Sequence, residues 1–313
     1  MKIYRYFILL TILFSSAIFG QNFDQKNRNF ASQKDSIYGT LTLPHSIDKP
    51  ILVILVPGSG PTDRNGNQGM IQNNSLKFLA EALAQKGFAS YRFDQTVIAQ
   101  AKLPDFKEEN YSFSGLVEEV RLICTQFKKE ENFSKIVIAG HSQGSLVGML
   151  ATPEYADAFI SLNGAGQSID KILYEQLNNQ VPQLEESFSK TLKQLKNGEK
   201  VTDFNPMLYS LFRPSVQPFL IDWMQYDPQV SITKIKVPVL IIGGTKDIQV
   251  SVHEAQLMNQ AAQNSKIVII ENMNHLFKEI KGGDAENQMS YMKPEMPIMN
   301  QLVDEIEFFL KGI

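Results

Sequence analysis

The chain has 313 residues, of which 43% are hydrophobic and 20% are charged, and its formal net charge at pH 7 is -3. With this composition the chain can bury one large core or two modest ones, so it is a globular protein. A slightly acidic chain has no basic surface for a polyanion, and we expect no nucleic-acid partner.

The first twenty residues differ from the rest of the chain. Lys2 and Arg5 precede an apolar run at 7–14, and small residues follow it up to Gly20. This order is typical of a secretory signal peptide, and the run is shorter than the roughly 20 apolar residues that span a membrane. We therefore expect 1–20 to be a signal peptide cleaved after Gly20. The mature protein is then secreted or periplasmic, without a stable membrane anchor.

Strand and helix patterns alternate along the rest of the chain. The stretch 36–44 alternates in polarity and predicts an antiparallel edge hairpin. In chain order there follow a strand at 51–56, a helix at 76–85, a strand at 88–93, a helix at 113–129, strands at 135–139, 158–163, 237–243 and 266–270, and a last helix at 299–310. Such alternation predicts an α/β fold with a mostly parallel sheet that helices cover on both faces.

One segment breaks this alternation. Residues 166–235 contain no convincing strand, and they show amphipathic helical patterns at 172–195, 206–212 and 218–226. We expect this segment to be a helical cap that walls a substrate pocket over the C-terminal edge of the sheet. The alternative is a helical decoration remote from the site. The core would then consist of 21–165 and 236–313.

The only cysteine, Cys124, excludes an intrachain disulfide, although the chain is expected to be exported. Its apolar neighbours place it on a helix. A buried, inert thiol is the expected role.

The segment Gly140-His141-Ser142-Gln143-Gly144 lies where a strand pattern changes to a helix pattern. A serine at such a junction occupies a sharp, strained turn that exposes its hydroxyl above the edge of the sheet. A Cβ at either glycine position would collide with the neighbouring strand or helix. The segment therefore predicts a nucleophile elbow with Ser142 as the nucleophile.

Ser142 needs a base within hydrogen-bond reach. The chain has four histidines. The His141 side chain must leave the elbow in another direction, His45 belongs to the predicted edge hairpin, and His253 lies on a predicted helix. His275 follows the last predicted strand, at the edge where the elbow also lies, and we predict it to be the base.

The base in turn needs an acid that orients it. Asp247 follows the strand at 237–243 and precedes the histidine, so nucleophile, acid and base have the chain order that an elbow fold requires. Asp94, after an earlier strand, is the alternative acid. A structural ion pair with Arg92 or Arg64 suits Asp94 better, and we predict Asp247.

The reaction also needs two N–H donors for the developing oxyanion. The backbone N–H of Gln143, directly after the nucleophile, is the first. The second is expected from the loop 57–66, whose small residues let its backbone approach a substrate closely. In this loop we choose Ser59, with Gly60 as the alternative.

Together these residues resemble the α/β-hydrolase superfamily, and more narrowly the bacterial dienelactone-hydrolase-like and S33 serine-aminopeptidase-like esterases. The shared motifs are Gly58-Ser59-Gly60-Pro61, Asp63-Arg64 and Asn274-His275, and the resemblance extends from Ile37 to the last helix. It implies an eight-stranded sheet, no cofactor and hydrolysis of an acyl bond. No cluster of histidines and acids has the spacing of a zinc site, so we expect no metal, and we expect the substrate to be a small acyl compound. Pro57 departs from the histidine that lipases and many esterases have at that place.

Three functions compete on these observations. The first is an exported hydrolase that cleaves a carboxylic ester through an acyl-enzyme on Ser142. The second is an aminopeptidase or thioesterase with the same triad; an aminopeptidase needs acidic residues to hold the substrate amine, and the cap offers Glu175, Glu185 and Glu186. The third is a non-catalytic binding protein, which the presence of all three triad residues disfavours. No pattern in the sequence indicates an oligomeric state.

Overall fold

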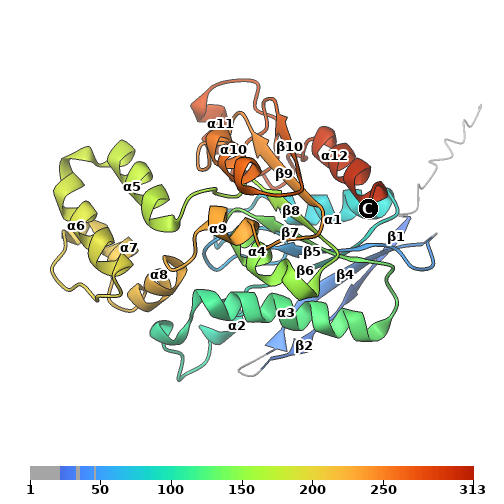
Figure 1. Cartoon of the computed structure of the whole chain (residues 1–313), viewed down its shortest axis with the longest axis horizontal. Coiled ribbons are helices and arrows are strands. Elements are labelled where there is room, and N and C mark those ends of the chain that lie inside the picture. Colours follow the sequence, from blue (N-terminus) through green and yellow to red (C-terminus); the bar gives the residue numbers. More distant parts are fainter. Residues whose placement is uncertain (1–21, 33–35, 46) are drawn as a thin grey trace, which may run out of the picture.

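The computed structural model of the chain describes residues 22–32, 36–45 and 47–313 (Figure 1). The predicted signal peptide, 1–20, lies outside the described residues. No helix within these ranges is long and apolar enough to cross a membrane.

An eight-stranded sheet forms the centre of the molecule. Its strands, in spatial order, are β1 (Phe23–Asn27), β4 (Gly39–Pro44), β6 (Ala89–Phe93), β5 (Leu52–Val56), β7 (Ile136–His141), β8 (Ala158–Leu162), β9 (Val239–Gly244) and β10 (Ser265–Ile270). The pairs β1–β4 and β4–β6 are antiparallel, and the other five pairs are parallel. This mostly parallel sheet confirms the predicted α/β fold.

The prediction that 36–44 forms one edge hairpin is wrong, because the two strands in this stretch pair with other strands and not with each other. The stretch divides into β3 (Ser36–Ile37), which pairs with β2 (Phe30–Ala31), and β4, which lies inside the sheet between β1 and β6. The strand at this edge of the sheet is β1, in which only Phe23 is buried, and β10 forms the opposite edge. A strand that buries one residue in five lacks the polarity alternation that predicts strands.

Helices cover the sheet on both faces because successive strand residues point to opposite sides. On one face Leu52, Ile54 and Val56 join a core cluster with α3 (Phe113–Glu130), α4 (Gln143–Tyr155), α9 (Pro228–Ile232) and α10 (Val252–Ala261). On the other face Val53 and Leu55 pack with α1 (Ser75–Gln85) and α12 (Asn300–Lys311). Each fully buried aliphatic side chain contributes about 1.5 to 3 kcal/mol, so both layers hold the sheet firmly. Cys124 is among the buried residues of the first cluster.

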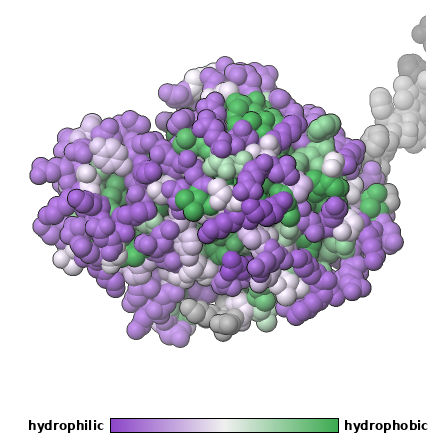
Figure 2. Space-filling model, in the orientation of Figure 1, coloured by the Kyte–Doolittle hydropathy of each residue, from purple (hydrophilic) through white to green (hydrophobic). Residues whose placement is uncertain are grey.

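Between β8 and β9 the chain forms four helices that stand apart from the sheet (Figure 1): α5 (Ile169–Gln180), α6 (Glu185–Lys196), α7 (Tyr209–Phe212) and α8 (Gln217–Trp223). We call this group the cap. It has an apolar cluster of its own, which includes Phe188, Leu195 and Phe212. Its visible surface is largely hydrophilic (Figure 2). The helix α9, by contrast, packs against α4 and α10 of the core.

The helical pattern at 172–195 forms two helices rather than one. They are separated by a single 3-10 turn, Pro182–Leu184. Proline lacks an N–H and disfavours helical geometry in the residue before it. Accordingly, Val181 has a ψ of 56° and ends α5. The remaining short α-helices of the described residues are α2 (Val97–Gln100), which follows β6, and α11 (Asp284–Ser290), which follows β10; two further 3-10 turns lie at Glu108–Asn110 and Pro206–Leu208.

Candidate active site

Ser142 lies at a strained turn between β7 and α4, with φ 55° and ψ -122°. Few non-glycine residues adopt such a backbone conformation, and where it occurs the surrounding structure must enforce it. A Cβ on Gly140 would lie 2.1 Å from the Gly144 carbonyl oxygen, and one on Gly144 would lie 2.4 Å from the Pro57 carbonyl oxygen. Close packing of β7, α4 and the loop after β5 therefore requires both glycines and sets the turn.

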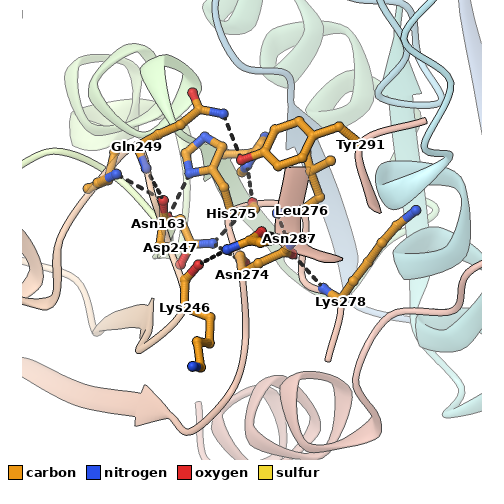
Figure 3. A network of polar contacts seen from close by, with 12 residues as sticks. Asn163, Lys246, Asp247, Gln249, Asn274, His275, Leu276, Lys278, Asn287 and Tyr291 are labelled. Carbon is orange, nitrogen blue, oxygen red and sulfur yellow. Dashed lines mark hydrogen bonds and ion pairs between the residues drawn. The ribbon is translucent and has the colours of Figure 1, made fainter. Parts of the chain in front are cut away.

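The loops after β9 and β10 bring Asp247 and His275 together. Asp247 Oδ2 lies 2.7 Å from His275 Nδ1, and both side chains are buried (Figure 3). The other carboxylate oxygen of Asp247 accepts hydrogen bonds from the backbone N–H groups of Gln249, at 2.8 Å, and Val250, at 2.9 Å. With an ionised Asp247 as acceptor, Nδ1 of His275 carries the proton, and its Nε2 is free to accept one.

Asn274 gives the loop that carries His275 its shape. Its buried side chain donates from Nδ2 to Asn287 Oδ1, at 3.0 Å, and to Ser290 Oγ, at 2.8 Å. Its Oδ1 accepts from the backbone N–H groups of Leu276, at 3.0 Å, and Lys278, at 2.9 Å (Figure 3). A buried amide with all four of its hydrogen-bonding sites satisfied is costly to move, so the orientation of the neighbouring histidine is well determined.

Two further side chains hold the His275 loop against the elbow. Asn163 Nδ2 and His141 Nε2 both donate to the His275 carbonyl oxygen, at 3.1 and 2.9 Å, and the two imidazole rings lie 4.8 Å apart. Burial lowers the pKa of His141 to about 3, so His141 stays neutral and is a structural donor. The sequence motifs did not identify Asn163. Its position could have done so, because Asn163 is a polar residue directly after the buried strand β8, at the edge where the site lies.

The candidate base His275 and the candidate nucleophile Ser142 thus lie on neighbouring loops. Among the described residues, no hydrogen bond joins Ser142 Oγ to His275 Nε2. Catalytic hydrogen bonds are often long in the absence of substrate and tighten when it binds. The placement is therefore compatible with transfer of the serine proton to the imidazole.

The alternative residues take other partners. Asp94 binds Arg64, accepting from its backbone N–H at 2.8 Å, its Nε at 3.0 Å and its Nη2 at 2.6 Å. This ion pair raises the pKa of the Arg64 guanidinium and ties the loop after β5 to the end of β6. His45 pairs with Asp24 on β1, and His253 lies on α10. None of these groups contacts His275 within the described parts of the chain.

The predicted oxyanion donors lie around one cavity. Gln143 is the first residue of α4, where backbone N–H groups and the helix dipole favour negative charge. Ser59 and Gly60 line the same cavity as Ser142 and Gln143. The structure therefore brings Ser142 and all three residues with candidate donors to one surface.

This cavity has a volume of about 400 Å³ and lies between the sheet edge and the cap. Its apolar lining includes Leu116, Leu146, Val216, Phe219, Leu220 and Trp223. Two aromatic stacks support it: Trp223 on Phe113, at 5.5 Å between ring centroids, and Phe219 on Tyr111, at 5.6 Å. The cavity thus suits an apolar group attached to a carbonyl that reaches Ser142.

The cavity has a single carboxylate among the described residues that line it, and that group is paired. Glu108 accepts from Arg213 Nε at 2.9 Å, from Arg213 Nη2, and from Ser215 Oγ at 2.5 Å. Arg213 holds the pKa of Glu108 below its usual value. The predicted amine-binding residues lie elsewhere: Glu175 accepts from Gln167 and lines a separate pocket, and Glu185 accepts from the Tyr174 hydroxyl.

The described ranges hold no group of three or more His, Cys, Asp or Glu side chains that is placed to bind a metal ion. Burial raises the pKa of the Cys124 thiol to about 12, so this residue is the inert thiol that the sequence predicts.

A family model described as serine aminopeptidase, S33, matches residues 72–279. Among curated proteins, esterase EstD of Thermotoga maritima is 24% identical over 287 residues, which cover 86% of this chain and 64% of the relative. The chain therefore spans slightly less than two thirds of the length of this relative.

Solved structures show the same fold. Est1E from Butyrivibrio proteoclasticus superposes with a TM-score of 0.60 at 17% identity, over 92% of this chain and 99% of that one. The Pyrococcus furiosus esterase PF2001 gives a TM-score of 0.56 at 16% identity, over 93% of this chain and 92% of that one.

Proposed function

The chain belongs to the serine aminopeptidase S33 family of α/β hydrolases, and from this premise we propose that it cleaves carboxylic esters of small molecules through an acyl-enzyme on Ser142. The observation that carries the proposal is the buried pair of Asp247 and His275, 2.7 Å apart, beside a serine in a strained elbow. EstD and PF2001, to which the chain is similar, are both named esterases, and this supports the proposal.

In the proposed mechanism, His275 Nε2 removes the proton of Ser142 as its Oγ attacks the ester carbonyl carbon. The tetrahedral oxyanion accepts hydrogen bonds from backbone N–H groups, of which Gln143 supplies one. The C–O bond to the alcohol then breaks, and the alcohol leaves with the proton from His275. Water attacks the acyl-enzyme with His275 again as the base, which releases the carboxylic acid and restores the serine. Asp247 stabilises the imidazolium in both steps.

An ester with an apolar acyl group suits the cavity better than an aminoacyl amide. A substrate ammonium would need an unpaired carboxylate beside it, because burying a charge without a partner is costly. The carboxylate that lines the described cavity, Glu108, is already bound to Arg213. We therefore place esterase activity ahead of aminopeptidase activity.

We also propose that the protein acts outside the cytoplasm, after removal of 1–20. This part of the proposal rests on the order of basic, apolar and small residues at the start of the chain.

The test is a panel of p-nitrophenyl esters, thioesters and aminoacyl p-nitroanilides, assayed with the wild-type chain and Ser142→Ala. We expect ester hydrolysis in the wild type, single labelling at Ser142 by a fluorophosphonate, no effect of EDTA, and a loss of about 10⁴-fold or more in kcat in the variant. Faster turnover of aminoacyl amides than of esters would instead identify an aminopeptidase. A variant that keeps a tenth of the wild-type rate would place the nucleophile elsewhere, and a wild type that is neither active nor labelled would identify a binding protein.

A further inference from the structure

Gln95, two residues after β6, is a buried side chain that holds the loop between β5 and α1. Its Nε2 donates to the Gly58 carbonyl oxygen at 2.8 Å, and its Oε1 accepts from the Thr62 backbone N–H at 3.3 Å. Its own backbone N–H donates to the Thr62 carbonyl oxygen at 3.2 Å. One residue thus fixes both ends of the segment that contains two of the three candidate oxyanion donors, Ser59 and Gly60.

The bond to Gly58 determines the direction of a neighbouring N–H. In a trans peptide the carbonyl and the N–H of the same unit point in opposite directions. Because the Gly58 carbonyl is directed at Gln95, the Ser59 N–H is directed away from Gln95. Neither Ser59 nor Gly60 donates its N–H to any acceptor in the described part of the chain.

The Gly58–Ser59 peptide is also the part of this loop that lies against the nucleophile. A Cβ on Gly58 would lie 3.3 Å from Ser142 Cβ, whereas one on Gly60 would meet the Gln68 side chain. The next carbonyl, that of Ser59, accepts from Thr62 Oγ1 at 3.0 Å and from Gln68 Nε2. The residue that controls the peptide beside Ser142 is therefore Gln95, and Gln68 controls the peptide that follows.

We propose that Gln95 is a positioning residue for the oxyanion site, which acts by directing the Ser59 N–H toward the oxygen that develops negative charge. The inference rests on the proposed function, since it concerns the same acyl transfer. It assigns the second oxyanion donor to Ser59 in preference to Gly60. It also explains why an uncharged, buried amide lines the catalytic cavity.

Two variants separate the two hydrogen bonds. Gln95→Met has a similar length and loses both, whereas Gln95→Glu keeps the acceptor for Thr62 and loses the donor to Gly58. Removal of a whole oxyanion donor costs about 10² to 10³ in kcat, and a misdirected donor costs less. We expect both variants to lose about 10- to 100-fold in kcat with KM nearly unchanged. Rates are corrected for the active fraction by fluorophosphonate titration.

The diagnostic measurement is inhibition by a trifluoromethyl ketone, which forms a tetrahedral adduct with an active serine. In both Gln95 variants we expect inhibitor affinity to fall by the same factor as kcat/KM, because the adduct carries the oxyanion. Retention of wild-type values by Gln95→Glu would show that only the Thr62 bond matters and would overturn the proposal. A larger loss in Gln68→Met than in Gln95→Met would assign the donor to Gly60 and would also overturn it.

Gln217 offers a matched structural control. This buried glutamine of the cap donates to the carbonyl oxygens of Val201 and Phe212 and accepts from the Val201 N–H. Gln217→Met should lose thermal stability as Gln95→Met does but keep its kcat and inhibitor affinity. If the Gln95 variants behave like this control, the inference fails while the esterase proposal stands. A wild type without esterase activity would overturn both.

Discussion

The sheet edge and the cap enclose the same cavity, but different forces hold them together. At the edge, Ser142 has a strained backbone, and the amide of Asn274 has all its hydrogen-bonding sites satisfied. In the cap, apolar side chains such as Phe188, Leu195 and Phe212 pack into a separate cluster. Directional bonds therefore dominate at the sheet edge, and non-directional packing dominates inside the cap.

Under the proposed function, this difference separates the residues that carry out the reaction from those that select the substrate. A hydrogen-bonded site tolerates few replacements, because each lost partner leaves a buried polar group unsatisfied. An apolar cluster tolerates swaps of similar volume at small cost. The cap can therefore change its lining while the edge keeps its chemistry, and the variants below are chosen to separate these two parts.

The largest expected effect comes from Asp247 at the edge. Asp247→Asn should lower kcat by about 10⁴-fold with little change in fold, because an amide favours the wrong tautomer of His275. Asp94→Asn should instead lose about 1 to 3 kcal/mol of stability, because it weakens charge-assisted bonds to Arg64. The measurements are kcat with an ester substrate and the free energy of unfolding in urea.

The contrast between the two aspartates decides the assignment. A well-folded but inactive Asp94→Asn, together with an Asp247→Asn that keeps most of its rate, would place the acid on the earlier strand. The hydrogen bonds that matter for catalysis would then be those of the loop after β6, not those of the loop after β9.

The elbow was predictable because it depends on local pattern. The change from strand to helix around Ser142, with a glycine on each side, specifies its own turn. Asp247 and His275 follow strands whose carboxyl ends meet at one edge, so their proximity follows from the order of elements. The residues that hold the loops around the site were harder to predict. Asn163 binds the loop that carries His275, and Gln95 binds the loop after β5. Both contacts join segments distant in sequence, so they depend on the register of the whole sheet.

The sequence predicted that the cap is helical, but it did not predict where its helices break or what they pack against. Amphipathic spacing predicts that a helix buries one face, and it does not specify against which partner. The break at Val181, the separate core of the cap and the packing of α9 on α4 and α10 depend on tertiary contacts. The lining of the cavity was therefore not predictable either, because Phe219 and Trp223 line it only as a result of how the cap folds back over the sheet.

A smaller effect is expected from Trp223, on the cap side of the cavity. Trp223→Leu shortens the lining and removes the stack on Phe113. We expect the ratio of kcat/KM for long over short acyl esters to rise by about 10- to 100-fold, since each methylene in an apolar pocket is worth about 1 to 3 kcal/mol. The rate on the acetyl ester should change little.

The control for Trp223 is Phe308→Ala, which removes an exposed aromatic ring from α12. This variant should show the wild-type ratio. An unchanged ratio in Trp223→Leu, or a collapse of kcat on every ester, would contradict the division between reaction and substrate choice.

The smallest expected effect concerns stability alone and comes from a buried carboxyl group on the helix α3. Glu119 on α3 accepts from Thr96 Oγ1 at 2.5 Å, and its other oxygen is buried without a partner among the described residues. Burial raises the pKa of Glu119 from its ordinary value of 4.5 to about 7. Between these two pH values the folded chain holds a proton that the unfolded chain has released, so stability falls as the pH rises through this window.

Glu119→Gln cannot ionise and keeps an acceptor for Thr96. Its free energy of unfolding should match that of the wild type near pH 4.5, exceed it increasingly up to pH 7, and remain higher by about 1 to 3 kcal/mol at pH 8. Urea unfolding at pH 4.5, 6, 7 and 8 measures the difference. Parallel pH profiles for the two proteins would show that Glu119 is ionised in the folded chain already at pH 6, paired by groups or water that offset its burial. In that case the Glu119 carboxylate would be fully hydrogen-bonded, as the amide of Asn274 is at the sheet edge.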